Sequence, residues 1–181
     1  MLPAVVPPSF LHRFRRGIRI SSIDRNQATV CYLHTRGKVL LQRRAQGRLW
    51  AGRLNGPGGK MAAGETATAA IEREVREETG LRLDNVRSAG VLDLCFGDPA
   101  SRLLQVHLFT CDRFTGRPRG GREGALRWYG IHRLPFDDLW PDMRYWLPLV
   151  LAGGEVNGTC EYDDSGADLR ACRLGLQFAV A

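Results

Sequence analysis

Three glutamates, Glu74, Glu77 and Glu78, have a spacing that gathers carboxylates along one flank of a helix. We place Ile71 at 0°, at the centre of the helix's apolar stripe. Glu78 then falls at about −20°, Glu74 at about −60° and Glu77 at about −120°. Unpaired charge on a buried flank is costly, and like charges three and four residues apart repel each other. A bound cation relieves both penalties, so the spacing predicts a metal site.

A solvated acidic face is the usual alternative for a glutamate-rich helix. Here, however, Glu72, Arg73 and Arg76 occupy the outward face. Carboxylates without nearby His or Cys ligands favour Mg²⁺ or Mn²⁺ over zinc. Mg²⁺ also leaves coordination positions for water and substrate phosphate, and the glycine-rich run Gly52–Lys60 precedes the helix. The pattern indicates a metal–phosphate site.

The elements that position these carboxylates can be read from periodicity. The acidic helix is predicted over Thr66–Thr79, and Gly80 is the left-handed residue that ends it. Strands at Gln27–His34 and Val39–Arg43, joined by a turn at 36–38, predict a hairpin. We further expect strands at Ser88–Leu94, Leu103–Cys111, Leu126–Ile131, Glu155–Tyr162 and Leu169–Phe178, a helix at Asp142–Leu151 and a loop over 112–124. This order predicts an α/β or α+β domain with a mixed sheet.

Composition predicts one globular domain. The chain has 181 residues and a net charge of +7, and all its basic residues except Lys38 and Lys60 are arginines. Arginine suits phosphate binding, although an arginine-rich codon usage explains the same bias. No apolar run approaches the ~18 residues that span a membrane. Five irregularly spaced cysteines without a CxxC pair favour a reduced, intracellular compartment.

We expect residues 1–25 to form a basic, flexible tail and residues 26–181 to form the domain. The first 23 residues contain no acid and carry four arginines. An organelle transit peptide is the alternative. Pro3, Pro7 and Pro8 interrupt the opening of any amphipathic helix, which favours a cytoplasmic protein.

The segment Gly59–Leu81 resembles the Nudix box, G-x5-E-x7-R-E-U-x-E-E-x-G-U with U aliphatic, at every defined position. The resemblance implies a Nudix hydrolase: an αβα sandwich with a mixed sheet and a loop–helix–loop motif. Members of this family hydrolyse nucleoside diphosphates linked to another moiety. A metal-activated water would attack phosphorus, and the cations would stabilise charge on the phosphate oxygens.

The family pattern also implies residue roles. Arg73 would orient the glutamates by ion pairing, and Lys60 would contact phosphate. The implied metal ligands are Glu74, Glu77, Glu78 and the main-chain carbonyl of Gly58, while Gly59, Glu65 and Gly80 would support the loop. Which glutamate acts as general base and how many metals bind stay open.

The similarity extends to the MutT-type branch, which cleaves oxidised purine nucleoside triphosphates. Residues 53–60, R-L-N-G-P-G-G-K, resemble its R-W-N-G-x-G-G-K, and residues 134–146 resemble its I-P-F-x-x-M-W-P-D-D-x-Y-W. The alignment brings Glu123 to a loop glutamate that contacts metal or water. The resemblance spans about residues 28–178.

This branch implies a base pocket. Trp140 would stack on a purine, and Asn55 and Asp142 would read its edge. The alternatives are a core tryptophan and a turn-forming asparagine. Leu54 stands at the branch's pocket tryptophan, where it would also contact the substrate. Met143 stands at the branch's second aspartate, and these two departures leave the base preference open.

We therefore expect a Mg²⁺-dependent pyrophosphohydrolase that converts 8-oxo-dGTP to 8-oxo-dGMP and pyrophosphate. One alternative is hydrolysis of ADP-ribose, a dinucleoside polyphosphate or another nucleoside diphosphate derivative. Another is a non-catalytic nucleotide-sensing or RNA-binding module, which retention of every box glutamate disfavours. We expect a nucleotide substrate, no membrane and no stable nucleic-acid partner. The sequence does not decide between a monomer and a dimer.

Overall fold

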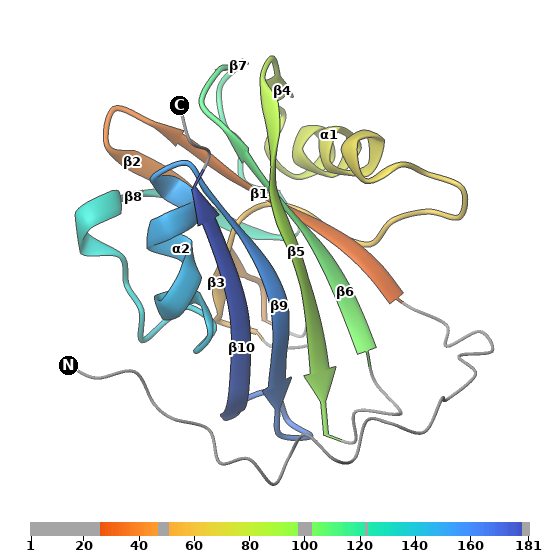
Figure 1. Cartoon of the computed structure of the whole chain (residues 1–181). Helices are drawn as coiled ribbons and strands as arrows, with labels where there is room; N and C mark the ends of the chain where they lie inside the picture. Colours follow the sequence, from red (N-terminus) through yellow and green to blue (C-terminus); the bar gives the residue numbers. More distant parts are fainter. Residues whose placement is uncertain (1–25, 47–50, 98–102, 122, 179–181) are drawn as a thin grey trace, which may run out of the picture.

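The computed structural model describes residues 26–46, 51–97, 103–121 and 123–178 (Figure 1). The tail expected at 1–25 lies outside these residues. The described strands are β1 Asn26–Thr35, β2 Lys38–Arg44, β3 Leu54–Asn55, β4 Arg82–Leu83, β5 Val86–Phe96, β6 Leu103–Cys111, β7 Phe114–Thr115, β8 Gly124–Gly130, β9 Gly154–Tyr162 and β10 Leu169–Phe178. The α-helices are α1 Ala67–Thr79 and α2 Met143–Leu151, and Ile131–Arg133 forms a 3-10 turn.

The large sheet is mixed, as the element order predicted. Its strands follow the order β10-β9-β5-β6-β1-β2-β3, and β8 pairs with β2 off this path. The pairs β1–β6 and β5–β9 are parallel, whereas β1–β2, β5–β6 and β9–β10 are antiparallel. The central β1 therefore brings the amino-terminal hairpin beside a strand from the middle of the chain.

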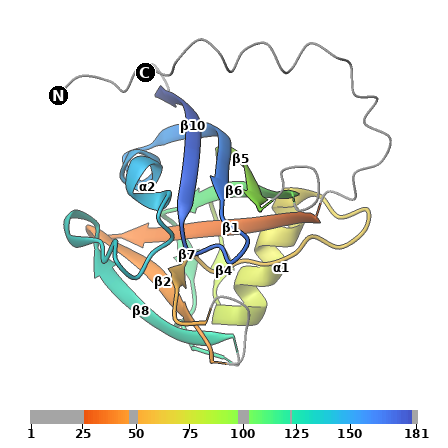
Figure 2. The same cartoon turned by 90° about the horizontal axis from the view of Figure 1, so that it is seen from below.

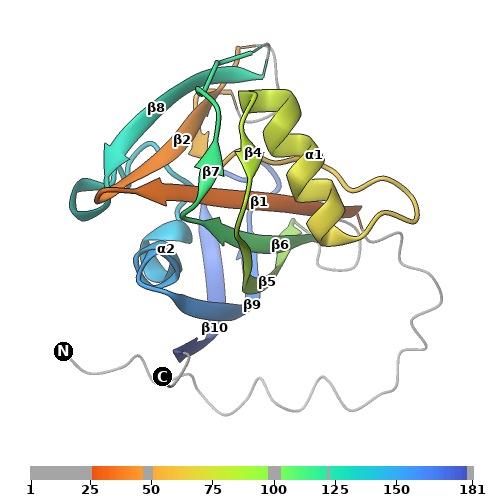
Figure 3. The ribbon, with the colours of Figure 1, turned by 90° about the horizontal axis from the view of Figure 1, so that it is seen from above.

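The two helices cover opposite faces of this sheet (Figure 3). Because side chains alternate along a strand, Val30 and Tyr32 of β1 join the cluster that holds the α2 side chains. Cys31 and Leu33 join the cluster that holds Ile71 and other α1 side chains. Figure 2 shows α2 beside the β9–β10 end of the sheet. The αβα sandwich is thus confirmed.

Helix α1 begins and ends with the signals that its sequence predicts. Thr66 caps the first turn, and its Oγ1 accepts a hydrogen bond from the Ala69 N–H at 3.2 Å. Gly80 ends the helix in the left-handed region, with φ +73°. The buried stripe consists of Ala70, Ile71, Val75 and Thr79. The core therefore fixes the rotation of α1 and, with it, the direction of the glutamates.

Two short pairings correct the sequence reading. Residues 112–124 were expected to be a loop, but β7 pairs there with β4. The glycine-rich run Gly52–Lys60, for which we gave no strand, contains β3, which pairs with β2. Strands β3, β4 and β7 have two residues each, which is too short for an alternating pattern to be recognised in the sequence.

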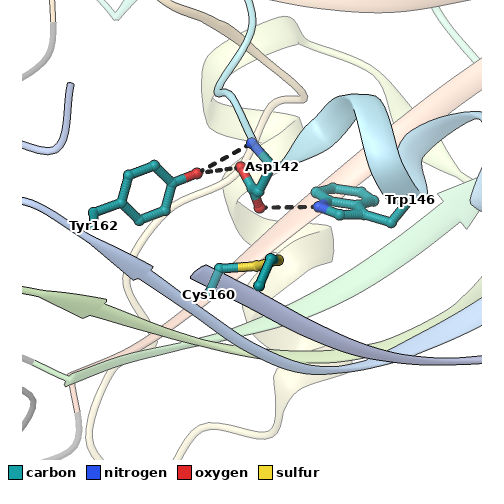
Figure 4. Close-up of a disulfide and its surroundings, with 5 residues drawn as sticks. Asp142, Trp146, Cys160 and Tyr162 are labelled. Carbon is teal, nitrogen blue, oxygen red and sulfur yellow. Dashed lines mark hydrogen bonds between the residues drawn. A yellow bond between two sulfur atoms is a disulfide. The ribbon is translucent and has the colours of Figure 1, made fainter. Parts of the chain in front are cut away.

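The cysteine spacing did not predict a disulfide, yet Cys160 and Cys172 are bonded (Figure 4). They are register partners on β9 and β10, so the pairing of the strands, and not the sequence separation, brings them together. Cys31, Cys95 and Cys111 are buried free thiols. No helix in the described part of the chain is both long and apolar enough to cross a membrane.

Candidate functional site

A cavity of about 670 Å³ connects the acidic helix with the predicted base pocket. Its apolar wall comes from strands β5 and β6. The predicted site residues that line it are Asn55, Gly58, Gly59, Lys60, Glu74, Glu77, Glu78, Glu123, Trp140 and Asp142. Segments distant in sequence therefore meet around one volume, large enough for a small-molecule ligand.

The glycine-rich loop lies directly against β1. The Thr29 N–H donates to the Gly59 carbonyl at 2.8 Å, and the Cys31 N–H donates to the Pro57 carbonyl at 2.9 Å. Gly58 has φ +152°, and a Cβ there would lie 2.1 Å from the Thr29 carbonyl oxygen. Only glycine fits this approach. The Gly58 N–H in turn donates to Glu78 Oε2 at 2.9 Å, so the loop positions a box glutamate.

Arg73 connects the loop to the glutamates. Its Nε and Nη2 each lie 2.9 Å from a Glu65 carboxylate oxygen, and its Nη1 lies 2.8 Å from Glu74 Oε1. Its Nη2 also donates to the Lys60 carbonyl at 3.2 Å. Hydrogen bonds from Arg73 lower the pKa of Glu65 to about 2. This geometry matches the orienting role expected of Arg73 and the supporting role expected of Glu65.

The three box glutamates occupy different environments. The Glu77 side chain is 61% exposed and Glu74 only 15%, while Glu78 is half-buried. Burial raises the pKa of Glu78 to about 7, the Gly58 N–H opposes this shift, and the charges of Glu74 and Glu123 add to it. A partly buried carboxylate beside two other acids is the setting that a cation stabilises.

These carboxylates do not yet converge into a closed cage. Among the described residues no group of three or more His, Cys, Asp or Glu side chains is drawn together tightly enough to hold an ion. Arg73 holds Glu74, the loop holds Glu78, and Glu77 extends toward solvent. The oxygen donors nevertheless line one cavity, and carboxylate oxygens are the ligands that a hard divalent cation prefers.

The charge on Glu78 predicts a pH effect on the metal-free protein. A carboxyl whose folded pKa is raised stabilises the fold below its unfolded value, and this stabilisation is lost as pH rises to the folded value. As pH rises from about 4.5 to 7, the free energy of unfolding of the parent protein should therefore fall relative to that of the Glu78→Gln variant. The fall should be at most about 1.4 kcal/mol per pH unit. Urea unfolding in EDTA at several pH values measures the difference, and excess Mg²⁺ should reverse it. A constant difference across this range would contradict the assignment.

Gly59 provides a second prediction, because a Cβ there would lie 2.5 Å from Glu74 Oε2. The obstructing atoms belong to the end of a flexible side chain, so Glu74 can turn away. Gly59→Ala should therefore lower turnover at least about tenfold while the melting temperature changes little. Gly130→Ala is the matched control, since a Cβ there meets nothing within 4 Å. Comparable rates for the two variants would show that the position of Glu74 is unimportant.

The hydrogen-bonding groups of the predicted base pocket are held in fixed directions. Asn55 Oδ1 accepts from the Tyr32 hydroxyl at 2.9 Å and from the Gly56 N–H at 2.8 Å. Its amide NH₂ donates to no other described residue, which leaves a donor for a ligand. The turn-forming and ligand-binding interpretations of Asn55 are therefore compatible.

Asp142 is buried, and its carboxylate lies between Trp146 and Tyr162 (Figure 4). Trp146 Nε1–H donates to Oδ2 at 2.9 Å, and the Tyr162 hydroxyl donates to Oδ1. Burial raises the pKa of Asp142, and these two donors oppose the shift. Trp140 is only partly buried and packs edge-on against Phe96 and Tyr162. It lines the cavity and also packs against the core, so the two interpretations of Trp140 are compatible.

Leu54 is the exception among the predicted substrate-binding residues. It is fully buried, bridges to Leu139 and does not line the cavity. The prediction that it contacts substrate is therefore corrected: the β2–β3 pairing turns its side chain into the core. Met143, by contrast, does line the cavity.

Sequence reasoning missed several residues around the cavity. Tyr32 orients Asn55, and Trp146 and Tyr162 hold Asp142. The cavity is also lined by Thr29, Gln42, Arg44 and Arg53. The Trp146 contact could have been read from its i, i+4 spacing to Asp142, whereas the tyrosine contacts depend on strand register.

Comparison with known proteins agrees with this geometry. The NUDIX domain family model matches residues 24–150. The mouse protein "Oxidized purine nucleoside triphosphate hydrolase" is 38% identical over 128 residues, covering 70% of this chain and 80% of the mouse protein. The zebrafish protein of the same name is 38% identical over 116 residues, covering 64% of this chain and 72% of the zebrafish protein.

Solved structures show the same fold. The MutT protein from Bacillus halodurans has a TM-score of 0.72 at 23% identity, and the match covers 82% of this chain and 97% of that one. The MutT Nudix hydrolase from Burkholderia pseudomallei has a TM-score of 0.55 at 26% identity, and the match covers 61% of this chain and 86% of that one. From the domain match, the relatives and the fold, the chain belongs to the Nudix family and is a MutT-type Nudix hydrolase.

Proposed function

We propose that this enzyme is a Mg²⁺-dependent nucleoside triphosphate pyrophosphohydrolase that prefers oxidised guanine nucleotides, with 8-oxo-dGTP as favoured substrate. The observation that carries the proposal is the shared cavity: box glutamates line one part of it, and Asn55, Trp140 and Asp142 line another. A purine triphosphate can place its base and its phosphates in these two parts at once. The names of the mouse and zebrafish relatives, and of the Escherichia coli "8-oxo-dGTP diphosphatase" at 30% identity over 104 residues, support this choice.

Nudix hydrolases generally use divalent metals, and the donors here suit Mg²⁺, with Mn²⁺ as a substitute. Glu74, Glu77, Glu78 and the Gly58 carbonyl would hold the metal, which supplies charge neutralisation at phosphate and an acidified water. Glu123 lines the same part of the cavity, where it can contact metal or water.

The chain's own basic groups act around this centre. Arg73 fixes Glu74 and ties it to the loop. The exposed ammonium of Lys60 lies at the cavity's rim, where it can pair with phosphate oxygens. Water would attack a phosphorus of the α–β linkage, the bond from that phosphorus to the bridging oxygen would break, and the departing phosphate group would carry away the electron pair.

The direction of the pocket's polar groups favours guanine. The Asn55 NH₂ offers donors, and the carboxyl of Asp142, to which Trp146 and Tyr162 both donate, offers acceptors. Guanine presents O6 and N7 acceptors together with N1–H and N2–H donors, which match this pair. Trp140 offers a ring face or edge beside the base.

A substrate panel with Mg²⁺ tests the proposal. We expect the highest kcat/KM for 8-oxo-dGTP, a lower value for dGTP and the lowest for ADP-ribose. Faster cleavage of ADP-ribose would favour a housekeeping diphosphate-derivative hydrolase. Binding without turnover of any nucleotide in the panel would indicate a sensing module and overturn the proposal.

A further inference from the structure

Tyr162 and Asp142 form a reciprocal pair of hydrogen bonds (Figure 4). The Asp142 N–H donates to the Tyr162 hydroxyl oxygen at 3.4 Å, and the hydroxyl donates to Asp142 Oδ1. A phenol has one proton, and accepting the backbone N–H leaves that proton directed at the carboxylate. The indole N–H of Trp146, which can only donate, donates to Asp142 Oδ2 at 2.9 Å. Both carboxylate oxygens therefore meet protein donors.

Tyr162 is held rigidly behind the cavity wall. It is fully buried on β9, stacks on Phe96 at 5.4 Å between ring centroids and meets the edge of Trp140 at 5.7 Å. It does not line the cavity itself, whereas Phe96, Trp140 and Asp142 do. Its hydroxyl can therefore influence a ligand only through Asp142.

We propose that Tyr162 is a specificity-determining positioning residue whose hydroxyl keeps Asp142 a hydrogen-bond acceptor, so that the pocket selects purines with a donor edge. This inference rests on the proposed function, because it assumes that Asp142 reads the base. It names the class of base that the site takes: guanine-type rings, with adjacent N1–H and N2–H donors, over adenine-type rings.

The chemistry of the two rings explains the selection. When each oxygen of an ionised carboxylate accepts one hydrogen bond from the protein, each oxygen still has a second lone pair. The carboxylate can therefore accept two parallel N–H hydrogen bonds from guanine. An adenine edge presents one donor beside an unprotonated N1, whose lone pair repels a carboxylate. Pairing with it requires a protonated carboxyl that both donates and accepts.

The hydrogen bond from the Tyr162 hydroxyl disfavours the protonated form of the Asp142 carboxyl. Burial favours the neutral carboxyl of Asp142 by raising its pKa, and the donors on Tyr162 and Trp146 oppose burial. Without the Tyr162 hydroxyl, Asp142 Oδ1 loses its side-chain donor. The neutral form of the Asp142 carboxyl then becomes more stable relative to the ionised form. The expected consequence is a change in which base binds. A packing role alone would not produce this change, because phenylalanine retains the aromatic contacts.

Binding of nucleoside monophosphates to the full chain tests the inference without requiring hydrolysis. We expect calorimetric titration to show tighter binding of dGMP than of dAMP. Tyr162→Phe should reduce the dGMP-to-dAMP affinity ratio at least about tenfold, as loss of a hydrogen bond to a charged group implies. The control is Tyr145→Phe, which removes a hydroxyl from a side chain that is 56% exposed. Its ratio should stay within about twofold of the parent value.

Several results would overturn the inference: an unchanged ratio in folded Tyr162→Phe, an equal loss of both affinities, a parent preference for dAMP, or no binding of either nucleotide. Trp146→Phe removes the other side-chain donor and should shift the ratio in the same direction, which keeps the test decisive if Tyr162→Phe does not fold. The parent protein could instead bind dGMP selectively and hydrolyse no triphosphate. That result would contradict the proposed function and would still support the role of Tyr162.

Discussion

Glu78→Gln should lower Mg²⁺-dependent turnover by roughly a thousandfold, because a metal ligand supplies several kcal/mol of transition-state stabilisation and each 1.4 kcal/mol is tenfold in rate. The amide keeps the size of Glu78 and removes the charge that a hard cation requires. Glu77→Gln should show a loss of similar size. Steady-state kinetics with saturating Mg²⁺ and a purine triphosphate measure both.

Folding of these variants should be preserved, since Glu77 is exposed and a neutral amide in place of the Glu78 carboxylate no longer repels Glu74 and Glu123. Glu72→Gln on the same helix is the matched control, because its side chain is exposed and does not line the cavity. It should retain near-parent rates. A near-normal rate for either box variant with Mg²⁺ would show that the metal assignment is wrong.

Asp142→Asn should lower kcat/KM for guanine triphosphates about 100-fold, as loss of about 3 kcal/mol of charge-assisted base recognition implies. The nitrogen of the new amide cannot accept from Trp146 or Tyr162, so it also leaves a buried donor without an acceptor. The melting temperature should therefore fall as well. Most of the kinetic loss should appear in KM, because the metal chemistry is retained.

Asp137→Asn is the matched control for Asp142→Asn. Asp137 lies in the same loop, is exposed and does not line the cavity. We expect its kinetics and melting temperature to match the parent enzyme. If Asp142→Asn changed kcat and left KM and base preference untouched, Asp142 would have no role in reading the base.

The acidic helix and its neighbours were predictable because their geometry is local. Thr66 and Gly80 bound the helix, and the apolar stripe through Ile71 and Val75 fixes its rotation. The Glu65–Arg73 pair follows from that rotation and from the length of the preceding turn. The box therefore contained both the elements and most of the half of the site that we propose to bind metal.

The half that we propose to bind the base depends on contacts between distant strands, which no local pattern records. Tyr32 reaches Asn55 only because the loop after β3 lies against β1, and Tyr162 reaches Asp142 only because α2 begins beside β9. Leu54 fails as a pocket residue for the same reason: its direction is set by pairing with β2. The Cys160–Cys172 bond likewise requires the β9–β10 register.

Product analysis of 8-oxo-dGTP hydrolysis with Mg²⁺ is the decisive test for a metal-dependent pyrophosphohydrolase. We expect equal amounts of 8-oxo-dGMP and pyrophosphate, with product formation abolished by EDTA and strongly reduced in Glu78→Gln. Release of inorganic phosphate with 8-oxo-dGDP, or a rate that is indifferent to EDTA and to Glu78→Gln, would contradict it.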